Sequence, residues 1–155
     1  PLSVFTQAVY ALAERNIPVV VHIILGLPGE SRETVLRTID YLNRLPIQGV
    51  KLQLLHVLSD SDLADLYRAG EYTPLEKEEY LTLVGDCIAH LRADIVLHRL
   101  TGDGDKNTLL APLWSLRKRD VLNHLHRYLR ENHIRQGMSC KIDLSVIYNK
   151  PKDVL

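Results

Sequence analysis

The chain has 155 residues, enough for one domain with a hydrophobic core, and its 19 Lys and Arg balance its 19 Asp and Glu. This balance excludes a global field that would draw the whole molecule to nucleic acid or to a membrane surface. No apolar run reaches the ~18 residues of a membrane span, and the two cysteines, Cys87 and Cys140, lack metal-ligand spacing and indicate reduced thiols in a cytoplasmic protein.

The first two predicted elements are a helix over 3–15 and a strand over 19–25. Apolar residues at helical spacing favour the helix, and Asn16-Ile17-Pro18 ends it. The strand is apolar apart from His22 and rich in β-branched residues, which is typical of a strand covered on both faces. The chain opens directly on the helical pattern without an initiator Met, so we expect a fragment of a longer protein.

A turn with two glycines and a proline, Gly26-Leu27-Pro28-Gly29, follows this strand and precedes a helix. Glycine permits a positive φ or a close backbone approach, and proline stiffens the turn. The carboxyl ends of strands in α/β proteins are where ligands bind, and the first N–H groups of a helix lack partners within it. We therefore expect a ligand mouth here, with a purely structural turn as the alternative.

The remaining elements alternate between helices and strands. They are a helix from Ser31 to Pro46, a strand over 49–57, a short helix over 61–69, a helix over 75–91, a strand over 94–100, a loop over 101–107, an apolar stretch over 109–116 and a helix over 117–132. This alternation predicts a parallel sheet of about three strands. Three strands cannot close a barrel, so we expect an exposed sheet edge that needs a partner, either a missing half or a second copy. The tail, 138–155, contains alternating apolar residues, which predict either an added edge strand or a segment that covers one.

Polar residues interrupt the second predicted strand. Side chains alternate along a strand, so Leu52 and Leu54 face the helices while Lys51 and Gln53 face the opposite way, into a cavity or cleft. A lysine inside a parallel sheet is costly unless it is paired or near water. Either this face holds a polar ligand, or Lys51 extends outward from the start of the strand.

The other two strands also carry polar groups. His22 lies in the first strand, His56 ends the second, and either His98 or Arg99 faces the cavity at the end of the third. Each histidine alone is more often a structural residue of the core than a catalytic one. Polar groups on three neighbouring strands together favour a ligand mouth.

Three other patterns exclude or weaken specific functions. The loop containing Asp103 and Asp105 lacks the Gly and Glu that an EF-hand needs, so we exclude calcium and keep a polar turn or a substrate contact. The last helix carries Arg117, Arg119 and Arg127, which suit either a solvated surface or contacts to phosphates. No activated nucleophile is recognisable, which makes a hydrolase the least favoured class.

Three stretches of the chain resemble the carboxyl-terminal part of radical S-adenosylmethionine enzymes of the YhcC/YtqA-like group, relatives of the elongator catalytic subunit. The stretches are His22 to Glu30, Val50 to Val57 with the following residues 63–72, and Leu97 to Leu100 leading to Thr108 to Trp114. They occur in order and cover residues 1–137. The resemblance implies an α/β fold, half of a partial β/α (TIM-like) barrel, with a carboxyl-terminal helical extension.

The resemblance also implies the chemistry and its residues. The family uses a [4Fe–4S] cluster and S-adenosylmethionine to generate a 5′-deoxyadenosyl radical. Cofactor contacts would come from His22, Ile24, Gly26, Leu27, Pro28, Gly29 and His56, and substrate contacts from Lys51, Gln53, His98, Arg99, Thr101 and Asp103. Several relatives act on tRNA, which suggests tRNA modification.

The chain departs from this family in one respect. The Cys-x3-Cys-x2-Cys motif that holds the cluster is absent. We therefore expect no metal ligands here and an inactive chain that needs an N-terminal barrel half. The alternatives are a half-barrel that binds a nucleotide or RNA without catalysis, and a structural half that pairs its edge strand in an oligomer.

Overall fold

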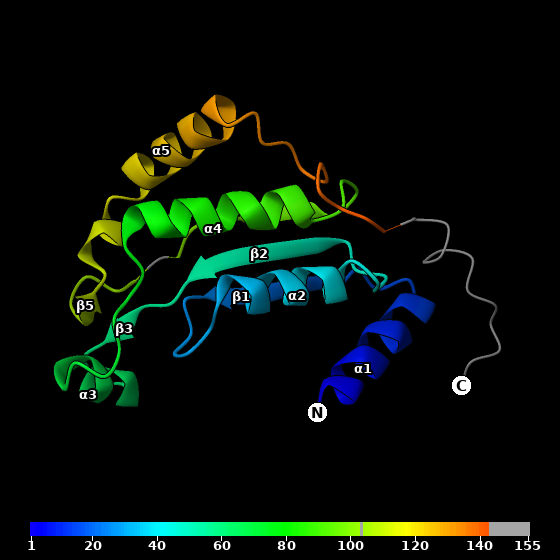
Figure 1. The fold of residues 1–155 in the computed structure, drawn as a ribbon. Coiled ribbons are helices and arrows are strands. Elements are labelled where there is room, and N and C mark those ends of the chain that lie inside the picture. Colours follow the sequence, from blue (N-terminus) through cyan, green and yellow to red (C-terminus); the bar gives the residue numbers. More distant parts are fainter. Residues whose placement is uncertain (103, 143–155) are drawn as a thin grey trace.

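The computed structural model of the chain describes residues 1–102 and 104–142 (Figure 1). Its elements, in chain order, are α1 (Leu2–Glu14), β1 (Val20–Leu25), α2 (Arg32–Leu42), β2 (Gly49–Leu54), β3 (Val57–Leu58), α3 (Asp62–Arg68), α4 (Lys77–His90), β4 (Val96–Arg99), β5 (Leu109–Ala111), the 3₁₀ helix η1 (Leu113–Leu116) and α5 (Lys118–Glu131). No described helix combines the length and the apolar character needed to cross a bilayer. Asp103 and most of the predicted tail strand lie outside the described residues.

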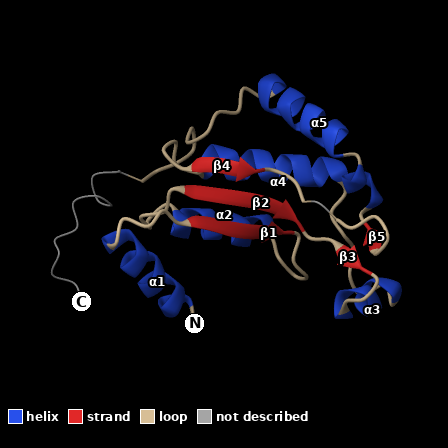
Figure 2. Ribbon diagram, turned by 180° about the vertical axis from the view of Figure 1, so that it is seen from behind, coloured by secondary structure: helices blue, strands red, loops and turns tan. Residues whose placement is uncertain are grey.

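The central sheet has three parallel strands in the order β1-β2-β4, which confirms the predicted parallel α/β fold. Helices α2 and α4 pack over one face of this sheet, and Figure 2 shows the strands in front of both helices. Helix α2 begins as expected, because the Ser31 hydroxyl accepts a hydrogen bond from the Thr34 N–H. The main hydrophobic core lies between this sheet and its helices.

The opposite face of the sheet is open, which corrects the expectation that β1 is covered on both sides. Ile23 and Leu25 are buried, whereas Val20, His22 and Ile24 on the other face are exposed. The reason is that helices cover one side of the sheet only (Figure 2). The continuous apolar run of β1 therefore includes aliphatic side chains that nothing in the described part of the chain covers.

The second predicted strand divides in two, because the chain leaves the parallel sheet after Leu54. Val57 pairs instead with Ala111 in a small antiparallel sheet formed by β3 and β5. A second cluster of buried residues lies here, next to α3, and includes Tyr72. His56 consequently lies in the connection between β2 and β3 and not at the end of a strand.

Helix α1 is placed as the pattern predicted, but its apolar residues are mostly uncovered. Val9 is its one buried residue, while Leu2 and Val4 are each more than half exposed. Its contact with α2 includes a hydrogen bond between the hydroxyls of Thr6 and Tyr41. The exposed apolar side of α1 and the open face of the sheet are both surfaces that a further element could cover.

Candidate functional site

The polar face of the sheet is built by alternation along β2. Leu52 and Leu54 are buried beneath the helices, while Lys51 and Gln53 are half-buried on the open face, as the sequence predicted. Their neighbours on β1 complete the pattern, since His22 lies opposite Lys51 in the strand register. The imidazole Nε2 of His22 is hydrogen-bonded to the side-chain oxygen of Gln53. The open face is therefore polar at its centre.

The third strand adds two basic side chains to this face. The expectation was that either His98 or Arg99 would face the cavity, but an irregularity in the register opposite Val50 and Lys51 leaves both exposed. In the strand register, Arg99 lies opposite Lys51. The ring of His98 lies over Gly49, where an added Cβ would come within 2.5 Å of two ring atoms. No local sequence pattern identifies Gly49, because its close approach to His98 depends on a neighbour 49 residues away.

His56 joins the same face from beyond the end of β2. A Cβ added at Gly102 would lie 2.6 Å from His56 Cε1 and 3.2 Å from Gln53 Cγ, so the chain after β4 passes closely over these side chains. Thr101 is different, because it is only 6% exposed and lines a small cavity with Trp114. The structure thus brings His56 to the open face and places Thr101 in the interior.

The turn after β1 has the backbone conformation expected of its glycines, with φ +91° at Gly26 and +73° at Gly29. Its polar groups are engaged within the chain. The Tyr72 hydroxyl donates to the Gly26 carbonyl at 2.7 Å, and the Glu30 carboxylate accepts from the N–H groups of Gly26 at 3.3 Å and Leu27 at 3.4 Å. The turn is therefore closed by its own glutamate. The predicted donors were the first N–H groups of α2, and of these the Thr34 N–H is capped by the Ser31 hydroxyl.

The segment Leu27 to Gly29 is exposed at the tip of this turn. Burial raises the pKa of Tyr72, which keeps its hydroxyl protonated as the donor to Gly26. At this turn, the exposed Leu27 side chain is accessible to a ligand. Ile24, on the open face of the sheet, is also exposed. These residues remain candidate cofactor contacts.

A groove of about 450 Å³ lies beside this turn, between α2 and α4. Its apolar residues include Val35, Leu75 and Leu83. Asp86, which also lines it, pairs with Arg32 across the two helices. The groove is on the helix-covered side of the sheet, so it is separate from the polar open face.

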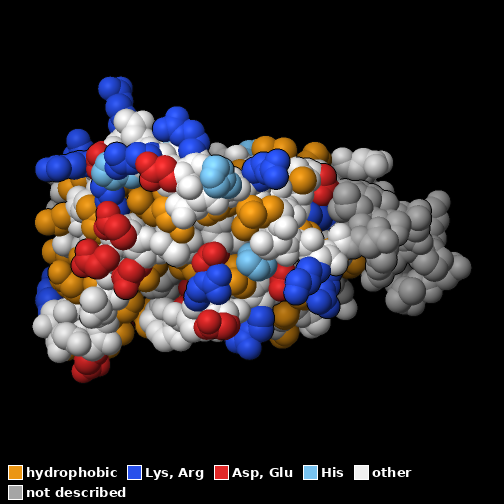
Figure 3. Space-filling model, turned by 45° about the horizontal axis from the view of Figure 1, so that its top comes forward, with side chains coloured by type: hydrophobic (Ala, Val, Ile, Leu, Met, Phe, Trp, Pro, Cys, Tyr) orange, Lys and Arg blue, Asp and Glu red, His pale blue; other side chains and the backbone are white. Residues whose placement is uncertain are grey.

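Helix α5 carries the basic residues that suggested a phosphate-binding surface. Val121 and Leu125 are buried on its inner side, and Asp120 pairs with Lys77 of α4. Figure 3, which brings the α5 side of the molecule forward, shows Lys and Arg interspersed with Asp and Glu. This view favours a solvated helix surface over a continuous basic patch.

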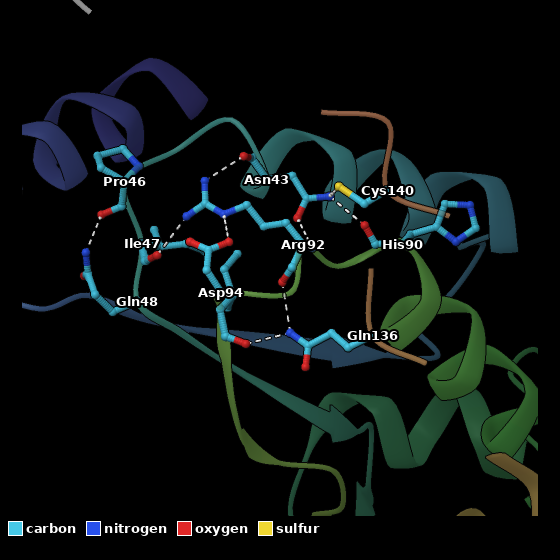
Figure 4. A network of polar contacts seen from close by, with 10 residues as sticks. Asn43, Pro46, Ile47, Gln48, His90, Arg92, Asp94, Gln136 and Cys140 are labelled. Carbon is cyan, nitrogen blue, oxygen red and sulfur yellow. Dashed lines mark hydrogen bonds and ion pairs between the residues drawn. The ribbon is translucent and has the colours of Figure 1, made fainter. Parts of the chain in front are cut away.

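A buried polar network at the start of the sheet was not anticipated from the sequence (Figure 4). The Arg92 guanidinium donates to the carbonyls of Asn43 at 2.9 Å and Ile47 at 3.1 Å and pairs with Asp94 at 3.0 Å. Gln136 donates to the Arg92 carbonyl at 2.9 Å. Because these groups satisfy one another, the network ties the ends of α2 and α4 together and is structural.

Among the residues that the structure describes, neither cysteine belongs to a group of metal ligands. Cys87 is buried in α4, and burial raises its pKa to about 12, so it is a neutral thiol. Cys140 lies far along the chain, where the Asn43 amide contacts its sulfur at 3.7 Å. Within residues 1–102 and 104–142, no group of three His, Cys, Asp or Glu side chains could hold a metal ion.

The comparisons with known proteins agree on one protein family. The model of the Radical_SAM C-terminal domain matches residues 47–131. The chain is 32% identical over 133 residues to the uncharacterized protein YtqA of Bacillus subtilis (86% of this chain, 41% of YtqA). It is 33% identical over 121 residues to protein YhcC of Escherichia coli K12 (78% of this chain, 39% of YhcC). The chain thus spans about two fifths of the length of these relatives.

One solved structure shows the same fold. The archaeal Elp3 of Methanocaldococcus infernus, with an N-terminal deletion, matches with a TM-score of 0.68 and 16% sequence identity. The match covers 83% of this chain and 31% of that structure.

Proposed function

Because this chain belongs to the radical S-adenosylmethionine family through its C-terminal domain, we propose that it forms the carboxyl-terminal half of a β/α barrel and one wall of its ligand cavity. The observation that carries this proposal is the open polar face of the sheet. A strand that is apolar apart from one histidine, such as β1, suits a sheet covered on both sides, yet here one side is bare. The bare side carries His22, Lys51 and Gln53, residues that suit a cavity containing a polar ligand.

The chain does not fit an iron–sulfur cluster by itself. Such clusters are held by cysteine thiolates, and this chain has two cysteines, of which Cys87 is buried as a neutral thiol. Full-length members of the family are expected to use S-adenosylmethionine and a [4Fe–4S] cluster. We propose that the cluster ligands lie on another segment and that this chain alone is inactive.

The partner in this proposal is an N-terminal barrel half. Strand β1 pairs only with β2 among the described strands, so its other edge is available for a further strand. A groove of about 310 Å³ next to that edge is lined by Leu2 and Phe5 of α1 and by Ile24. A second copy of the chain is the alternative occupant, and a tRNA is the substrate class that we propose for the complete protein.

The test compares the chain alone with a chimera in which it replaces the 133-residue matched segment of YtqA. After anaerobic reconstitution, we expect no iron in the chain alone and both iron and S-adenosylmethionine affinity in the chimera. In the chimera, His22→Ala should weaken S-adenosylmethionine binding by about tenfold without loss of iron, whereas His90→Ala on α4 should not.

Two outcomes would contradict the proposal. One is iron bound by the chain alone. The other is a folded chimera that binds neither iron nor S-adenosylmethionine when YtqA, reconstituted in parallel, binds both. Saturable RNA binding by the chain alone, lost when Arg117, Arg119 and Arg127 are neutralised, would instead favour a binding module.

A further inference from the structure

The groove between α2 and α4 is acidic as well as apolar, and it lies on the side of the sheet away from the proposed ligand cavity. Its volume is about 450 Å³, and its apolar lining includes Val35, Leu75 and Leu83. Four carboxylates but only one guanidinium also line it, from Glu30, Glu78, Glu79, Asp86 and Arg32. The acidic groove therefore combines an apolar surface with an excess of negative charge.

The negative charge of the acidic groove acts on the groups beside it. Burial is the main reason that the pKa of Cys87 is raised to about 12, and the charges of Asp86 and Glu30 raise it further. Glu78 is exposed and forms no ion pair within residues 1–102 and 104–142, so its charge is available to an outside partner. A surface of this kind suits an occupant that carries both apolar and cationic side chains.

The same chain exposes a segment with this chemistry between β5 and α5. Leu113 and Leu116 of η1 are 61% and 37% exposed. Three consecutive basic residues, from Arg117 to Arg119, follow them and are all exposed. Residues 113–119, named here the basic segment, thus complement the acidic groove in both hydrophobicity and charge.

The basic segment lies beside one end of the acidic groove but does not line it. The indole N–H of Trp114 donates to the carbonyl of Leu75, a groove residue, at 3.2 Å. Figure 1 shows the chain entering α5 next to the start of α4. Two complementary surfaces that are neighbours on one molecule can form a two-fold dimer in which each contact is made twice.

We propose that the acidic groove binds the basic segment of a second copy of this chain, so that two copies form a symmetric dimer. In this dimer the two leucines pack on the apolar lining of the groove, and the basic side chains lie against its carboxylates. The inference goes beyond the proposed function and does not depend on it, because the acidic groove and the ligand cavity lie on opposite sides of the sheet.

Sedimentation equilibrium of the 155-residue chain at low ionic strength measures this association, and we expect a dimer that weakens as added salt screens the charges. Glu78→Lys and Arg119→Glu each bring like charges together and should raise the dissociation constant of the dimer by about tenfold. An equimolar mixture of the two variants should associate again, because opposite charges then face each other. The control is Glu14→Lys, which makes the same charge reversal on α1 and should leave the dissociation constant unchanged.

The apolar part of the contact is tested by Leu113→Ala. The Leu113 side chain is mostly exposed, so the substitution should weaken the dimer while it leaves the thermal unfolding of the dilute chain unchanged.

Three results would overturn the proposal. One is a parent chain that is monomeric at every concentration, which would leave the groove to a basic segment of another protein. Another is a dimer that neither charge variant weakens, which would indicate association through a different surface, such as the open face of the sheet. The third is a mixture of the two charge variants that stays monomeric.

Discussion

Asp120 joins helices α4 and α5 through a single carboxylate. Its Oδ2 accepts a hydrogen bond from Lys77 Nζ at 2.9 Å, and its Oδ1 lies 3.4 Å from Nε2 of His124 one turn along α5. The hydrogen bond from Lys77 is the main reason that the pKa of Asp120 is lower than its ordinary value of 3.8. The ionised carboxylate therefore stabilises the packing of α5 on α4.

This pair makes part of the stability depend on pH. A carboxyl whose pKa is lowered by folding contributes stability that is fully present above about pH 3.8 and is lost as the pH falls through its folded value. We expect Asp120→Asn to lower the urea midpoint at pH 7 and to have a smaller effect at pH 3. Asp65→Asn, which removes an exposed pair with Arg68, is the matched control and should change little at either pH. If Asp120→Asn lowers the urea midpoint as much at pH 3 as at pH 7, this account is contradicted.

At the scale of elements, the turn between β1 and α2 is constrained by its own residues. Gly26 and Gly29 both have positive φ, but their surroundings differ. A Cβ at Gly26 would lie 3.1 Å from Cδ1 of Leu75, whereas a Cβ at Gly29 would meet nothing within 4 Å. The same turn is closed by Glu30 and anchored by Tyr72.

Alanine at these two positions should separate backbone strain from crowding. We expect Gly29→Ala to destabilise the chain by about 1–2 kcal/mol, the cost of a left-handed conformation for a residue with a Cβ. Gly26→Ala should cost roughly 1 kcal/mol more, because Leu75 must move as well. Chemical denaturation of both variants measures the difference. Equal effects of the two substitutions would show that Leu75 does not restrict the turn.

The whole molecule is a sheet with one covered face and one bare face. Ile23 and Ile24 are adjacent in β1 and chemically identical, yet Ile23 is 9% exposed beneath the helices and Ile24 is 43% exposed on the open side. The apolar residues of the open face include Val20 and Val96. An uncovered sheet edge and face of this kind favour association with another segment.

The two isoleucines give a matched test of this architecture. We expect Ile23→Ala to reduce the free energy of unfolding by about 2–5 kcal/mol, because it leaves a cavity in the core. Ile24→Ala should change it by less than about 0.5 kcal/mol, because its side chain already contacts solvent. Comparable losses from both substitutions would show that the second face is covered in solution, for example by self-association.

The sequence alone determined the features that depend on local geometry. The helices, the parallel order of the main sheet and the opposite orientation of Lys51 and Gln53 relative to Leu52 follow from apolar spacing and from alternation along a strand, and the structure agrees. The strand predicted over 49–57 is the exception, because the chain leaves the parallel sheet after Leu54. The positive φ of Gly26 likewise follows from residue type. The family resemblance supplied by the motifs is confirmed by the domain match, while the division at residue 137 and the individual contacts to cofactor and substrate stay predictions.

Only the tertiary structure decided which groups meet and which face is covered. The hydrogen bond of His22 with Gln53, the position of His98 over Gly49 and the Arg92 network join residues that are distant in sequence, so no local pattern predicts them. The bare face of β1 was missed for the same reason. An apolar run records what a strand can bury, whereas the helices that pack against it determine what it does bury.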